Sequence, residues 1–83
     1  MEKSDGDLHR ETLNRFNDLA NSMTEDGVEG RIVSAGLMSA SAVYATFLAA
    51  GNQGGLTESG IDKVVDAYRS QVVQVQEMKK AGD

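Results

Sequence analysis

The chain of 83 residues contains no cysteine, no proline and no tryptophan. The absence of cysteine excludes disulfides, thiolate nucleophiles and cysteine-ligated zinc. A chain without proline that is rich in alanine, valine and glutamate is typical of helical proteins. A chain this short folds to bury only about 60–65% of its unfolded surface. We therefore expect one small domain whose core is completed by a partner subunit.

Positive charge is also scarce, because 13 acidic residues stand against eight basic ones and leave a net charge of −5. The basic residues are scattered, whereas proteins that bind DNA gather them on one face. An acidic balance disfavours phosphate backbones and anionic membranes. We expect neither a nucleic acid nor a membrane as partner.

The charges fall into three blocks, since no Asp, Glu, Lys, Arg or His occurs between Ile32 and Thr57. Apolar residues recur at helical spacing in each block, and glycines mark the boundaries. The pattern predicts an all-α fold, a single domain of three helices at about 7–23, 33–50 and 57–79. We expect the ends, about 1–5 and 80–83, to fray.

Both outer helices have recognisable start signals. Ser4 to Asp7 offers small acceptors and acids that suit the positive end of a helix. Thr57 is the predicted N-cap of the third helix, with Leu56 and Ile61 placed as a hydrophobic staple. Residues 71–76 are rich in valine and alternate briefly as a strand would, but the sequence offers no second strand, so we predict helix.

The central helix has two different sides. One side carries large apolar residues, and we expect this helix to be the most buried of the three, with Gly51 as its candidate C-cap. The other side is formed by small residues that allow a close helix approach. These candidate interface residues are Ala35, Ser39, Ala42, Thr46 and Ala49.

This uncharged segment is also close to the length that crosses a bilayer. Ser34, Ser39, Ser41, Tyr44 and Thr46 interrupt it, and the flanking helices offer apolar stripes that match it. The N-terminus lacks the basic and apolar regions of a secretory signal. We therefore predict a cytoplasmic protein whose central helix packs against protein.

No constellation of residues predicts catalysis, and we expect no enzyme activity, cofactor or metal. His9 is the only histidine, and its place in a frayed region argues against a Ser-His-Asp relay. Without a second histidine or a cysteine, a transition-metal site would need carboxylates alone to complete it. An EF-hand register on Gly27 or Gly30 fails, because Val33 or Gly36 then occupies the twelfth position, which requires an acid. The glycines at 51–55 lack the lysine of a phosphate-binding loop.

Two segments resemble a known group of proteins. Residues 16–21 read Phe-Asn-Asp-Leu-Ala-Asn, and the central helix opens with Val33-Ser34-Ala35 and carries Tyr44 and Phe47. The chain resembles, over about residues 16–68, the small bacterial proteins of the domain of unknown function 3144 family. The resemblance implies a compact helical bacterial protein and no established activity.

These observations favour a protein-interaction or regulatory module whose small residues meet a partner helix. The simplest partner is the same face of a second copy, giving a homodimer; another protein is the alternative, as is coverage by the chain's own outer helices. Two further hypotheses remain open. The chain could be an acidic inhibitor, or nucleic-acid mimic, in a basic groove. It could also be a small-molecule-binding bundle with a pocket lined by Met38, Tyr44, Phe47 and Tyr68.

Overall fold

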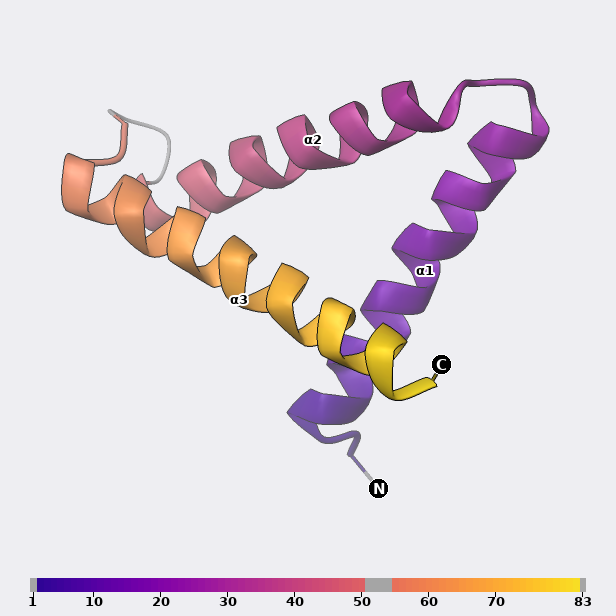
Figure 1. The fold of residues 1–83 in the computed structure, drawn as a ribbon. Helices are drawn as coiled ribbons and strands as arrows, with labels where there is room; N and C mark the ends of the chain where they lie inside the picture. Colours follow the sequence, from indigo (N-terminus) through magenta and orange to yellow (C-terminus); the bar gives the residue numbers. More distant parts are fainter. Residues whose placement is uncertain (1, 51–54, 83) are drawn as a thin grey trace. The chain divides into compact units, whose positions relative to one another are not determined.

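The computed structural model describes residues 2–50 and 55–82. They form three α-helices, α1 (Asp5–Glu25), α2 (Gly30–Ala50) and α3 (Glu58–Gly82), and contain no strand (Figure 1). The predicted all-α fold of three helices is confirmed, and residues 71–76 are helical. The helices reach further than predicted: Asp5 and residues 80–82 are helical, although the sequence predicts frayed ends there.

Helix α1 begins within Ser4 to Asp7, the segment that carries its predicted start signal. The Asp7 backbone N–H donates to Ser4 Oγ at 3.1 Å, and the Ser4 N–H donates to Asp7 Oδ2 at 3.4 Å. This capping box satisfies two backbone donors that a helix start leaves without partners. Asp5 and Asp7 also place negative charge beside the positive end of the helix dipole.

Helix α1 ends at a glycine in the left-handed region. Gly27 has φ of 98°, a value that residues with a Cβ rarely adopt. Its N–H donates to the Thr24 carbonyl at 3.0 Å, and the Val28 N–H donates to the Met23 carbonyl at 3.0 Å. These two bonds make a Schellman motif, which stops the helix and turns the chain toward α2.

Helix α3 begins directly after Thr57, as predicted. Thr57 Oγ1 accepts a hydrogen bond from the Gly60 N–H at 3.1 Å, so Thr57 is the N-cap. Glu58 adds an acid in the first turn. The candidate C-cap of α2, Gly51, lies outside the described residues.

The chain divides into two compact units, Met1–Ala40 and Ser41–Asp83, with the boundary inside α2. In the first unit Val33 is 8% exposed, and it is the only buried hydrophobic residue among those described. In the second unit no described residue is buried, and five are half-buried: Ala45, Thr46, Leu56, Gly60 and Val64.

Among the described residues only α2 contains a buried one, in line with the expectation that it is the most buried of the three helices, but even this helix is largely exposed. Apart from Val33, Ala45 and Thr46, the described side chains of α2 are exposed. Each unit contains only one other helix beside its part of α2. One neighbour covers a single stripe of a helix and leaves the rest of the circumference in water.

Candidate interaction surface

The five small residues Ala35, Ser39, Ala42, Thr46 and Ala49 lie on one continuous helix, because α2 is unbroken from Gly30 to Ala50. Their spacing alternates between four and three positions. At about 100° per residue they fall within an arc of about 80°. We call this arc the small-residue face.

Most of the small-residue face is uncovered. Ala35, Ser39, Ala42 and Ala49 are exposed, and only Thr46 is half-buried. Within each unit the neighbouring helix therefore leaves most of this face in contact with solvent.

The two hydroxyl groups on the face have no protein partner in the part of the chain that the structure describes. In α1, by contrast, two threonine hydroxyls donate to the backbone carbonyl four residues earlier. Thr12 donates to Leu8 at 2.7 Å and Thr24 donates to Ala20 at 3.1 Å. Ser39 and Thr46 have the same geometry available in α2. Their hydroxyls can turn to those carbonyls when a partner helix excludes water.

Helix α2 carries almost no charge. Its single charged residue, Arg31, lies in the first turn, and its Nε donates to Glu29 Oε2 at 2.9 Å. The small-residue face itself contains no charged residue. Two copies of this face can therefore approach without repulsion between like charges.

The four residues predicted to line a pocket belong to two helices, α2 and α3. Met38, Tyr44, Phe47 and Tyr68 are each more than half exposed. Met38 and Phe47 are nine positions apart on α2, which places them on opposite sides of the helix. A pocket lined by all four residues therefore stays a prediction.

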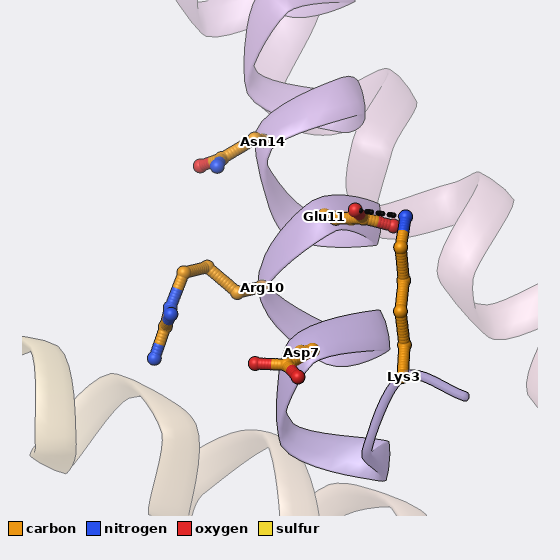
Figure 2. A pocket seen from close by; sticks show the side chains of 5 residues that line it. All are labelled: Lys3, Asp7, Arg10, Glu11 and Asn14. Atoms are coloured by element: carbon orange, nitrogen blue, oxygen red, sulfur yellow. Dashed lines mark hydrogen bonds and ion pairs between the residues drawn. The ribbon is translucent and has the colours of Figure 1, made fainter. Parts of the chain in front are cut away.

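Two hollows lie on α1 and the residues before it. Figure 2 shows one of them, lined by Lys3, Asp7, Arg10, Glu11 and Asn14, with Lys3 reaching along the helix to Glu11 as an ion pair. Its two acids and two bases balance. A second hollow is lined by Arg15, Phe16 and Leu19. His9 is exposed, and no group of three or more His, Asp or Glu side chains in the described ranges can hold a metal ion.

Helix α2 also meets the length and composition criteria for a membrane span. The apolar part of the helix, Gly30–Ala49, has 20 residues and is almost entirely exposed, with 6% of it buried. Such a helix is about 30 Å long, which equals the hydrocarbon thickness of a bilayer. Core helices of soluble proteins and signal sequences meet the same criteria, so length and composition alone do not separate these classes.

A second apolar surface lies on α3, and sequence reasoning treats it only as part of the core. Ile61, Val65, Tyr68 and Val72 are each about half exposed. We call these four residues the α3 stripe. Two signals in the sequence mark it as a candidate surface for helix pairing. Its residues are spaced by four, three and four positions, and α3 carries four acids and four bases.

The comparisons with known proteins add no relative to this picture. No protein-family model matches the chain, and neither does any curated protein or solved structure. The resemblance to the domain of unknown function 3144 family therefore stays a prediction.

Proposed function

We propose that this protein is an interaction module that acts by binding, in which the small-residue face of α2 packs against the same face of a second copy. The observation that supports the proposal most is that four of the five small residues are exposed on an uninterrupted helix. The absence of charge on the face supports a self-complementary contact.

The spacing of the face determines how two such helices would meet. An alternation of four and three positions has a mean period of 3.5 residues, the period of a left-handed helix pair that crosses at about +20°. Alanine and serine project little from the helix, so the two backbones come close and gain many dispersion contacts. Ala42 is the middle residue of the five and lies at the centre of this contact.

A larger side chain at Ala42 tests the proposal. Ala42→Leu should hold the helices apart and reduce the number of copies in the assembly, with helicity unchanged in circular dichroism. Ala40→Leu is the matched control, because it makes the same exchange at an exposed position about 160° away around α2. Light scattering coupled to size exclusion measures the mass. Equal masses for wild type and Ala42→Leu at micromolar concentration would overturn the proposal.

The absence of native cysteine allows a direct second test. In Ala42→Cys the introduced thiol is the only one in the chain. If the faces meet, oxidation should join the introduced thiols of two copies in a disulfide, since a disulfide requires Cα atoms about 4.4–6.8 Å apart. Ala40→Cys should remain largely unlinked under the same conditions. Equal linking of the two variants would indicate random collision instead of a specific contact.

A further inference from the structure

Helix α3 is much longer than the other helical segment of its own unit. The second unit contains 10 residues of α2, Ser41–Ala50, and 25 residues of α3. At about 1.5 Å per residue these segments are about 15 Å and 38 Å long. The half-buried residues of α3, Gly60 and Val64, both lie in its first two turns. The α3 stripe lies beside them around the helix and stays exposed.

The charges of α3 are segregated along its length. Its first part, 58–66, has three acids and one base, whereas its last part, 69–82, has three bases and one acid. Two α3 helices side by side in parallel would place like charges together. An antiparallel pair instead places the acidic part of each helix beside the basic part of the other.

We propose that the α3 stripe pairs, antiparallel, with the α3 stripe of a second copy of this chain. In the register that we assign, Val65 packs against Tyr68 of the second copy, and Ile61 packs against Val72 of the second copy. All four residues of the stripe are then covered. This arrangement is the knobs-into-holes packing that a 3.5-residue period produces.

Charge selects this register over its neighbour. In the assigned register Asp62 flanks the stripe beside Arg69 of the second copy, and two-fold symmetry forms this pair twice. Sliding the helices by one heptad toward their C-termini would place Arg69 beside Arg69 of the second copy. The ion pairs in the described part of the chain are Lys3–Glu11 and Glu29–Arg31, so Asp62 and Arg69 are available for an intermolecular pair.

This contact uses residues other than those of the small-residue face and goes beyond the proposed function. Each face is self-complementary, so each by itself builds a two-fold dimer. A chain that uses both faces assembles beyond a dimer. The two contacts can be tested independently because Ala42→Leu affects only one of them.

Two neighbouring valines provide the first test of the α3 contact. Val72 and Val73 are 50% and 48% exposed, but Val73 lies about 100° away around the helix, outside the stripe. In the Ala42→Leu background, Val72→Glu should weaken self-association at least about 100-fold, because it puts two unpaired acids into an apolar contact. Val73→Glu should change it less than about threefold. Equal weakening by both variants in sedimentation equilibrium would overturn the proposal.

Charge reversal tests the register. Asp62→Arg and Arg69→Asp, each alone, turn two attractive pairs into two repulsive ones and should each weaken association about tenfold to thirtyfold. The double variant Asp62→Arg/Arg69→Asp restores opposite charges and should return within about threefold of the starting affinity. Circular dichroism confirms that the variants stay helical. A double variant at least as weak as the single ones contradicts the assigned register.

The masses of four proteins separate the two proposals. If both contacts form, wild type exceeds a dimer, Ala42→Leu and Val72→Glu each give a dimer, and their combination gives a monomer. If only the α3 contact forms, wild type and Ala42→Leu are dimers, and Val72→Glu is a monomer. If Ala42→Leu is a monomer at 100 µM while Val72→Glu is a dimer, the α3 contact is overturned and the contact between the small-residue faces stands. A monomeric wild type at that concentration overturns both.

Discussion

The two units of the chain differ in how their side chains are buried and in where their charge lies. The first contains Val33, the one buried hydrophobic residue among those described, whereas no described residue of the second is more than half-buried. Residues 2–29 carry eight acids and three Lys or Arg residues, whereas α3 carries four acids and four bases. Residues 2–29 alone therefore have a net charge of −5, the same as that of the whole chain.

This difference separates two helices with similar apolar patterns. Helix α1 also exposes large apolar residues, including Leu8, Phe16 and Leu19. Two copies of α1 would bring together two strongly acidic surfaces, and the repulsion extends over about 8 Å at physiological salt. Helix α3 carries no net charge that would oppose pairing. Charge distribution therefore indicates which apolar face is suited to self-association.

The largest expected effect comes from charging the one buried position. Val33→Asp should lower the free energy of unfolding by about 3 kcal/mol or more, because it buries a carboxylate without a partner. Val73→Asp makes the same exchange at an exposed site of the second unit and should cost less than about 1 kcal/mol. Urea unfolding followed at 222 nm measures both. Similar losses would contradict the difference in burial between the units.

A smaller effect is expected at the turn that ends α1. Gly27→Ala should destabilise the protein by about 1 kcal/mol, because alanine is strained at a φ of 98°. Gly36→Ala should instead stabilise it by about 0.5–1 kcal/mol, because Gly36 is inside α2 and a Cβ there meets no atom within 4 Å. Opposite shifts of the thermal midpoint check both. A stabilising Gly27→Ala would show that the Schellman turn does not persist in solution.

The most local effects are expected at the two helix starts. Ser4→Ala and Thr57→Ala each remove one side-chain acceptor from a helix start, which costs about 1 kcal/mol. Amide hydrogen exchange should speed up in the first turn of α1 in the former variant and in the first turn of α3 in the latter. Faster exchange in both helices from a single variant would indicate that the two units unfold together.

Local features of the fold were predictable from the sequence. The N-caps Ser4 and Thr57 and the glycine turn after α1 depend on residues within a few positions of one another. The end of α3 was predicted about three residues too early, because lysines and a glycine near the end of a helix indicate that it ends there without fixing the residue. The predicted pocket stays a prediction, although Met38 and Phe47, nine positions apart on one helix, point to opposite sides of it.

The sequence by itself determined three helices, their start signals, an uncharged central segment and the position of its small residues. Those properties follow from backbone hydrogen bonding and helical periodicity, which act over one or two turns. Only the tertiary structure decided which apolar residues are covered. Val33 and Leu37 belong to the same side of α2, but Val33 is buried and Leu37 is exposed. Burial depends on where a neighbouring helix passes, and one helix covers only part of another.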